Sequence, residues 1–188
     1  MKQTRHNIFE TNSSSTHSVS LTNMSNDILN FEQLENYVDP ADHYIHIKFG
    51  EFGWGYNEYI DAYTKLQYLL NMIMETHKGE FCHEGEVSIE DFYNLDEYIL
   101  LESTIADYVP NCKGLCIYDD VIWKHEYESE DLNGNPCTGY YITYNGYIDH
   151  QSCEDYRCMM DFLNDYDTTI EDFVFDENVM LVIDCDNH

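Results

Sequence analysis

Residues 56–78, with the sequence YNEYIDAYTKLQYLLNMIMETHK, carry the longest helical pattern in the chain. Apolar side chains recur there every three or four residues, which is the spacing of one helix face. They are Tyr59, Ile60, Tyr63, Leu66, Leu69, Leu70, Ile73 and Met74. Gly79 follows directly, and glycine commonly lies just past a helix end. We therefore predict a long core helix over residues 56–78, on which the remaining elements pack.

Four shorter helical patterns flank this helix. The first covers residues 25–38 and ends at Asp39-Pro40, because the residue before a proline disfavours helical geometry. Ser88 and Asp91 have the spacing of a capping box, which predicts a helix that continues to about residue 108. The last two are predicted at residues 152–163, behind Ser152 and Asp155, and from Thr168 onward.

Strand-like segments separate these helices. Alternating apolar residues, rich in β-branched and aromatic types, predict strands at residues 19–21, 44–49, 113–118, 121–127, 140–144, 147–150 and 179–183. An acidic loop is predicted at residues 126–131, followed by a turn at residues 133–136. Asn145-Gly146 is a strong two-residue hairpin signal, because both turn positions need positive φ. We therefore expect the strands on either side of it to pair with each other.

Helices and hairpin-type strands are mixed without a regular strand–helix–strand repeat. That order favours an α+β fold with a mainly antiparallel sheet. The length of 188 residues suits one compact acidic domain over residues 1–188.

The charge is the most informative feature of the composition. Thirty-seven Asp and Glu stand against eight Lys and Arg, a formal charge of −29. The chain is nevertheless 43% hydrophobic and contains 17 Tyr, so it can build a core, unlike a disordered acidic tail. Direct binding of nucleic acid through general electrostatics is excluded. Two interpretations remain open: an ordinary solvated surface, or an acidic face directed at a partner.

The composition also bears on compartment and cofactors. An apolar run long enough to span a membrane is absent, and the start lacks the apolar segment of a secretion signal. Seven cysteines without a secretion signal indicate reduced thiols in the cytoplasm. Cys112 and Cys116, His43 and His46, and the group His77, Cys82 and His83 are the nearest approaches to metal-ligand spacing. Since none has the Cys-x-x-Cys pairing of a structural zinc site, we predict no metal, and we find no cofactor motif.

The carboxylates best placed to contact a partner lie in two regions. The first is the acidic loop with Glu126, Glu128, Glu130 and Asp131. The second is the C-terminal helical region with Glu154, Asp155, Asp161, Asp165 and Asp167. Arginine pairs with carboxylates and phosphates in the same forked geometry, so such groups can replace phosphates on a basic protein.

A catalytic alternative uses histidines. His17 follows a string of Ser and Thr hydroxyls, and His150 follows Asp149 where a strand is predicted to end. A histidine near hydroxyl groups suits acid–base or nucleophilic chemistry, with Glu51 or Asp149 to orient it. The strong negative charge opposes a polyanionic substrate unless the site is locally basic or holds a metal.

Several segments resemble known sequences. Residues 9–18, FETNSSSTHS, resemble the opening of a group of poorly characterised proteins from phages and Firmicute mobile elements. Residues 51–54, 65–70 and 148–152 are similar to other patches of that group. These motifs carry no established activity, so no catalytic role is transferred from them. In size and charge the chain also resembles the acidic proteins with which phages block host defence, namely DNA mimics and anti-CRISPR inhibitors.

These observations lead to three functional hypotheses. The first is an anti-CRISPR inhibitor that binds a host effector nuclease in the bacterial cytoplasm and blocks its guide RNA or target DNA. The second is a mobile-element hydrolase or transferase that acts on a nucleotide or RNA through His17 and His150. The third is a structural or regulatory phage protein without a role in defence.

Overall fold

The fold is α+β, as the sequence predicts. The computed structural model describes residues 15–21, 30–53, 56–82, 88–118, 122–131, 133–148 and 158–185, with the backbone alone at residues 15–21, 184 and 185. Helices and strands are mixed along the chain, and parallel as well as antiparallel strand pairs occur. Among the described residues, no helix has the length and apolar character needed to cross a membrane.

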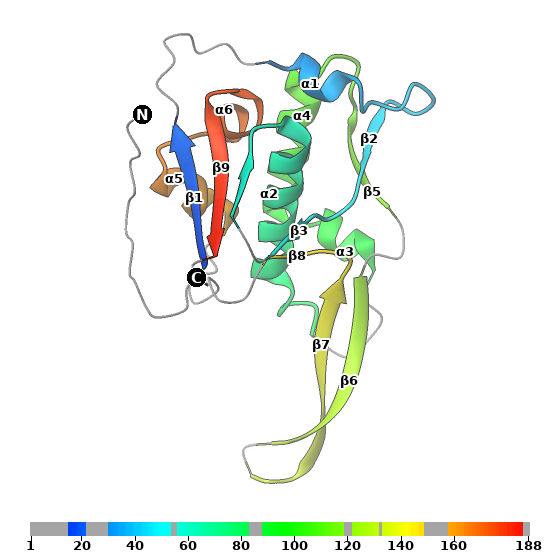
Figure 1. The fold of residues 1–188 in the computed structure, drawn as a ribbon. Helices are drawn as coiled ribbons and strands as arrows, with labels where there is room; N and C mark the ends of the chain where they lie inside the picture. The colour runs from blue at the N-terminus through cyan, green and yellow to red at the C-terminus, as the bar shows by residue number, and fades with distance from the viewer. Residues whose placement is uncertain are drawn as a thin grey trace.

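Helix α2, Ala62–His77, lies at the centre of the molecule, with the other elements around it (Figure 1). Most of its side chains are buried, including Leu66, Leu69 and Ile73. The predicted core helix is therefore confirmed, but its predicted start at residue 56 is wrong. Residues 57–59 form a strand, and the Asp61 side chain caps the helix by accepting a 2.8 Å hydrogen bond from the backbone N–H of Thr64.

An antiparallel three-stranded sheet lies beside α2. Its order is β1 (Ser15–Leu21), β9 (Val179–Cys185) and β4 (Asn57–Tyr59), so the last strand of the chain lies in the middle. The short helices α5 (Met159–Asp165) and α6 (Ile170–Phe175) precede β9. Thr169, one residue later than predicted, caps α6 by accepting a hydrogen bond from Asp172 N–H. The predicted cap residues Ser152 and Asp155 lie outside the described residues, and α5 begins only at Met159.

A second layer covers another side of α2. Strands β2 (Tyr44–Ile47) and β5 (Gly114–Ile117) pair in parallel there, next to helix α4 (Asp96–Tyr108). The Tyr98 hydroxyl ties α4 to this pair by donating a 2.9 Å hydrogen bond to the Leu115 carbonyl.

Two of the predicted helices are shorter than expected. The capping box at Ser88 and Asp91 is present, but it opens only the short helix α3, Ile89–Tyr93. The predicted helix to residue 108 is interrupted, because Leu95 adopts an extended conformation before α4 begins. Helix α1 covers only Glu32–Glu35, and Val38 instead forms a β-bridge with Ile45.

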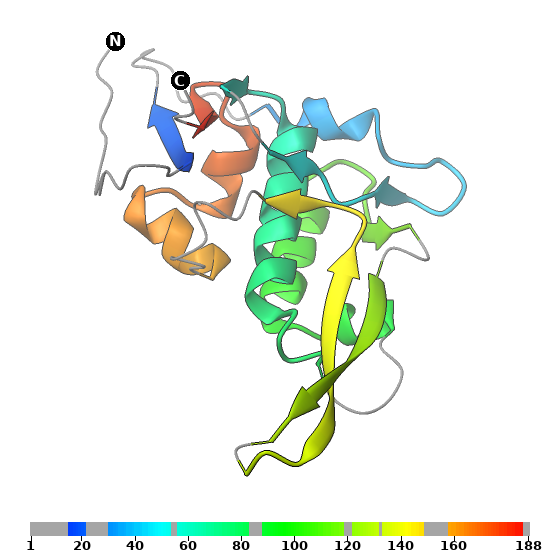
Figure 2. The same cartoon turned by 60° about the horizontal axis from the view of Figure 1, so that its bottom comes forward.

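Strands β6 (Ile122–Glu130) and β7 (Pro136–Tyr144) form an antiparallel ribbon that projects from the body (Figures 1 and 2). We call this ribbon, residues 122–144, the arm. The predicted acidic loop at residues 126–131 is wrong for residues 126–130, because these belong to strand β6. The predicted turn at residues 133–136 lies at the tip of the arm, although Pro136 already begins β7.

The predicted Asn145-Gly146 hairpin is also wrong. Strand β8 (Tyr147–Ile148) pairs in parallel with β3 (Glu51–Phe52), while β7 pairs with β6. A Cβ on Gly146 would lie 2.5 Å from the Cβ of Phe49 and 2.7 Å from the Gly50 carbonyl oxygen. Glycine is therefore needed here for close passage of two chain segments, and Gly146 does not adopt the positive φ of a hairpin turn.

One hydrophobic cluster connects these elements, from Leu34 near the beginning of the described chain to Ile183 in β9. Within it the Lys65 side chain of α2 is fully buried. Its ammonium group donates hydrogen bonds to the carbonyls of Asp176 and Val179, at 3.0 and 3.1 Å. Lys65 thus holds the junction between α6 and β9 against the central helix.

Candidate binding arm

The root of the arm is held by polar side chains of α2. The hydroxyl of Tyr144, the last residue of β7, donates a 2.6 Å hydrogen bond to the buried carboxylate of Glu75. The Tyr144 ring packs edge-on against Phe49, with centroids 4.9 Å apart. Lys78 donates to the second oxygen of Glu75, so both carboxylate oxygens have partners. The arm is thereby joined to the core at one end.

A second buried contact lies next to this root. The Asn71 side chain accepts a 2.9 Å hydrogen bond from Gly50 N–H and donates a 2.7 Å hydrogen bond to the Gly50 carbonyl. The same carbonyl accepts from Tyr147 N–H at 3.0 Å. Asn71 thus holds together the segment before β3 and the segment that leaves the arm.

The register of the ribbon separates its side chains onto two faces. Successive residues of a strand point to opposite sides of the sheet. Glu126, Glu128 and Glu130 therefore share one face, which we call the acidic face. Trp123, His125 and Tyr127 lie on the other side with Tyr141, the partner of His125 in the register. We call this second side the aromatic face.

The acidic face presents three carboxylates to solvent. Glu126, Glu128 and Glu130 are exposed, and none has a hydrogen bond or ion pair with any described residue. Alternate residues of a strand repeat at about 6.6 Å, so the carboxylates form an evenly spaced row. That repeat is close to the spacing of consecutive phosphates along a nucleic-acid strand. The one basic residue on this face, Lys124, lies nearer the root, with its ammonium 4.2 Å from the centre of the Tyr140 ring.

The aromatic face exposes three large rings, and two of them, Tyr127 and Tyr141, have contacts within the arm. Trp123, Tyr127 and Tyr141 are 45%, 50% and 47% exposed. The rings of His125 and Tyr141 stack, with centroids 4.7 Å apart and an angle of 17° between their planes. A Cβ on Gly139 would lie 2.4 Å from the Tyr127 ring, so this ring lies directly on the backbone of the opposite strand. The face is therefore an ordered platform of exposed aromatic surface.

Asp131 has a different role from the three glutamates. Its carboxylate accepts hydrogen bonds from the backbone N–H groups of Asn133 and Asn135, both at 2.8 Å, and from the Asn135 side chain at 2.9 Å. These hydrogen bonds, first those from Asn135, lower the pKa of Asp131. The predicted partner-binding residue Asp131 therefore builds the turn at the tip.

The second predicted acidic region lies apart from the arm. Asp161 and Asp165 are exposed on α5, and Asp167 is exposed just after it. Helix α5 lies on the side of α2 that carries the β1–β9–β4 sheet, away from the arm in both views (Figures 1 and 2). Glu154 and Asp155 lie outside the described residues. The structure thus separates Asp161, Asp165 and Asp167 from the predicted binding carboxylates of the arm.

The two residues of the catalytic alternative that the structure describes, His17 and Glu51, belong to different strand pairs. His17 lies in β1 opposite Ile183, and Glu51 lies in β3 opposite Tyr147. Asp149 and His150 follow β8 but lie outside the described residues. The described part of the chain therefore shows no arrangement in which His17 and Glu51 share a site.

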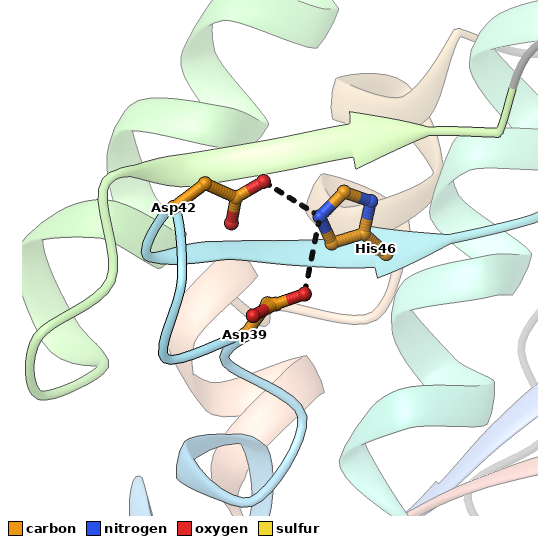
Figure 3. Close-up of side chains that lie close together, drawn as sticks. All are labelled: Asp39, Asp42 and His46. Carbon is orange, nitrogen blue, oxygen red and sulfur yellow. Dashed lines mark hydrogen bonds and ion pairs between the residues drawn. The ribbon is translucent and has the colours of Figure 1, made fainter.

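A further polar cluster joins the turn before β2 to that strand (Figure 3). The Nε2 atom of His46 lies 2.9 Å from Asp42 Oδ2 and 3.9 Å from Asp39 Oδ2. The remaining oxygens accept backbone hydrogen bonds, Asp39 from Ala41 and Asp42 from Tyr44. The Tyr44 bond, followed by that to His46, lowers the pKa of Asp42.

This cluster differs from the metal-like spacing noted in the sequence. Of the predicted pair His43 and His46, only His46 belongs to the cluster, and its other two members are aspartates. His43 adopts a φ of 70° within the turn that brings Asp39 and Asp42 to His46. The three side chains could offer one ligand atom each to a divalent cation, and here they bond to one another and to the turn. In the sequence, two aspartates three residues apart, followed by a histidine, are the pattern that could have indicated this cluster.

Comparison with protein-family models, curated proteins and solved structures finds no significant match to this chain. The resemblance to phage and mobile-element proteins therefore stays a prediction.

Proposed function

We propose that this chain is an acidic binding protein that inhibits a host nucleic-acid-targeting enzyme by placing its arm in a basic groove. The observation that carries the proposal is the row of three exposed carboxylates, Glu126, Glu128 and Glu130, on a ribbon that projects from the body. The root contacts of Tyr144 and Asn71 support it, because a rigid binding element loses less conformational entropy on association.

The favoured target is a CRISPR effector nuclease in the cytoplasm of a host bacterium. Such enzymes hold the guide RNA–target DNA hybrid in a positively charged channel. Carboxylates spaced like phosphates would pair there with Arg and Lys side chains and so block guide RNA or target DNA. The charge of −29 favours fast, salt-dependent association with a basic partner and opposes direct binding to nucleic acid.

A cleavage assay tests this proposal. Purified protein is added to a panel of RNA-guided nucleases and restriction endonucleases, and the concentration for half-inhibition is measured in low and high salt. The triple variant Glu126→Gln, Glu128→Gln, Glu130→Gln should inhibit about tenfold less well or worse. Three exposed ion pairs at roughly 0.5–1 kcal/mol each amount to about 2 kcal/mol, which is more than a factor of ten.

The matched control removes three exposed carboxylates elsewhere: Glu32→Gln, Glu35→Gln, Asp107→Asn. It changes the net charge by the same amount and should inhibit like the original protein. Equal loss in both triple variants would show that only overall charge matters, and inhibition of no panel member would contradict the proposal.

A double substitution distinguishes the catalytic alternative from inhibition by binding through the arm. The double variant His17→Ala, His150→Ala should leave inhibition unchanged if the arm acts by binding. Loss of inhibition in that variant, with the acidic-face triple variant still active, would favour chemistry instead. No observation among the described residues favours the catalytic alternative at present.

A further inference from the structure

We infer that the arm imitates a single nucleic-acid strand, and that its partner is a protein groove built for single-stranded nucleic acid. This inference rests on the proposed function and narrows it to one class of binding site. The observation behind it is that the three exposed carboxylates lie on one face of the ribbon and the exposed rings of Trp123, Tyr127 and Tyr141 lie on the other. The aromatic ring on the acidic face, that of Tyr140, is half-buried beside Lys124.

Single strands and duplexes present different chemistry to a protein. A duplex shows phosphates on its outside and keeps its base planes stacked inside. A single strand shows phosphates along one side and the faces of its bases along the other. Grooves for single strands accordingly combine basic side chains that follow the backbone with aromatic side chains on which the bases stack.

The arm has both halves of the single-strand pattern. Glu126 and Glu128 lie on one face, and Tyr127 between them points to the other. Across the ribbon, Tyr141 adds a second ring to the aromatic face, 6.1 Å from that of Tyr127. Mimicry of a duplex would use the carboxylates but gives no role to three aromatic side chains that are each about half exposed.

Contacts within the arm fix the positions of two aromatic rings in the unbound protein. Tyr127 lies on Gly139, and Tyr141 stacks on His125, so their outer surfaces are fixed. Rigid aromatic side chains provide contact area at low entropy cost. The row of three carboxylates, at about 6.6 Å per step, would occupy the positions of about three successive phosphates. The expected partner therefore offers Arg or Lys on one wall and aromatic side chains on the other.

Displacement of a labelled oligonucleotide tests the inference. A fluorescein-labelled oligothymidylate is bound to an OB-fold single-strand-binding protein, and the chain is titrated in while anisotropy is recorded. In parallel, a labelled duplex is bound to a restriction endonuclease held inactive by Ca²⁺. The chain should displace the single strand at lower concentration than it displaces the duplex.

A double variant and a matched control outside the arm test the aromatic face. Trp123→Thr with Tyr141→Thr keeps strand-forming residues and leaves Tyr127 on Gly139, so the ribbon should persist. It should need at least about tenfold more protein for half-displacement, since each stacked ring is worth roughly 1–3 kcal/mol. The matched control is Tyr56→Thr with Tyr118→Thr, which are 59% and 51% exposed and lie outside the arm. The control should act within about twofold of the original protein.

The outcomes distinguish this inference from the proposed function. Displacement of the duplex at equal or lower concentration, or an aromatic-face variant as active as the original protein, would overturn single-strand mimicry. Inhibition of nucleases through the acidic face would still stand in that case. Displacement of neither probe would also overturn single-strand mimicry, and the cleavage panel would then decide the proposed function separately.

Discussion

The hydroxyl of Tyr144 donates a 2.6 Å hydrogen bond to the buried carboxylate of Glu75, and this contact joins the end of the arm to the central helix. Among the described residues, Tyr144 and Lys78 are the two whose side chains donate hydrogen bonds to Glu75. Loss of either leaves a buried carboxylate short of a partner, which costs more than the bond itself contributes.

Tyr144→Phe should therefore destabilise the protein by about 1–3 kcal/mol, the cost of an unsatisfied buried polar group. Urea unfolding followed by circular dichroism measures the change in the free energy of unfolding. Tyr141→Phe, which removes a hydroxyl from the exposed aromatic face, should change that free energy by less than about 0.5 kcal/mol. Equal effects in the two variants would contradict a special role for the Tyr144 hydroxyl.

Asn71→Leu should destabilise the protein by about 2–4 kcal/mol, since both backbone groups of buried Gly50 lose their side-chain partner. Gln67→Leu, one turn earlier on α2, removes a single exposed hydrogen bond to the Lys48 carbonyl and should cost about 1 kcal/mol or less. Urea unfolding of both variants tests the difference, and a smaller effect at Asn71 than at Gln67 would refute it.

Gly139→Ala should displace the Tyr127 ring, because the added Cβ would lie 2.4 Å from it. We expect weaker displacement of the oligothymidylate probe while the three glutamates of the acidic face stay in place. Gly79→Ala is the control, since a Cβ there meets nothing within 4 Å. If Gly139→Ala and Gly79→Ala act alike in the displacement assay, the position of Tyr127 has no part in binding.

His77 should make stability depend on pH near neutrality. Its ring nitrogens lie 2.9 Å from Glu80 and 2.8 Å from Glu97, and both must carry hydrogen to bond these acceptors. Burial alone would lower the pKa of His77, but the hydrogen bonds to Glu97 and Glu80 outweigh it and raise the pKa.

A raised pKa in the folded state means that the stabilisation is complete below about pH 6.5 and is lost as pH rises through the folded-state pKa. The melting temperature of the original protein should therefore fall relative to that of His77→Gln as the pH rises above about 6.5. Gln67→Leu, on the same helix, replaces a side chain that does not titrate and should keep the pH dependence of the original protein. A constant difference between the original protein and His77→Gln across that range would contradict the assignment.

Lys65 should make the stability of the protein rise with pH, in a more alkaline range than that of His77. Burial lowers its pKa to about 8 from an ordinary value of 10.5. Between these two values the unfolded chain binds more protons than the folded protein, so stability rises with pH. Comparison with Lys65→Met cancels the contribution of the tyrosines. The free energy of unfolding of the original protein should increase relative to that of Lys65→Met from pH 8 to 10, and a decrease would refute the depressed pKa.

Local signals in the sequence predicted several elements correctly. The apolar period of residues 62–77 predicted the central helix, and Ser88 with Asp91 predicted a capping box. The strand segments at residues 44–47, 114–117 and 179–183 also lie where the pattern placed them. All of these depend on neighbours within about one helical turn or a few strand residues, so periodicity and capping chemistry are sufficient.

Strand pairing was predicted less well, because the partner of a strand is distant in sequence. Asn145-Gly146 has the composition of a hairpin turn. Strand β8 nevertheless pairs with β3, which lies almost a hundred residues earlier in the chain. The acidic stretch at residues 126–131 is predicted as a loop, but residues 126–130 pair with β7 and so belong to a strand. The cluster of Asp39, Asp42 and His46 likewise depends on a turn in which His43 has positive φ.

The sequence alone determined the α+β class, the central helix and the excess of negative charge, since composition and short-range periodicity carry that information. Only the tertiary structure decided that Glu126, Glu128 and Glu130 line one face of a projecting ribbon, with Trp123 and Tyr127 on the other. The physical reason is that side-chain direction in a strand depends on its register with a partner strand, and non-local packing sets that register.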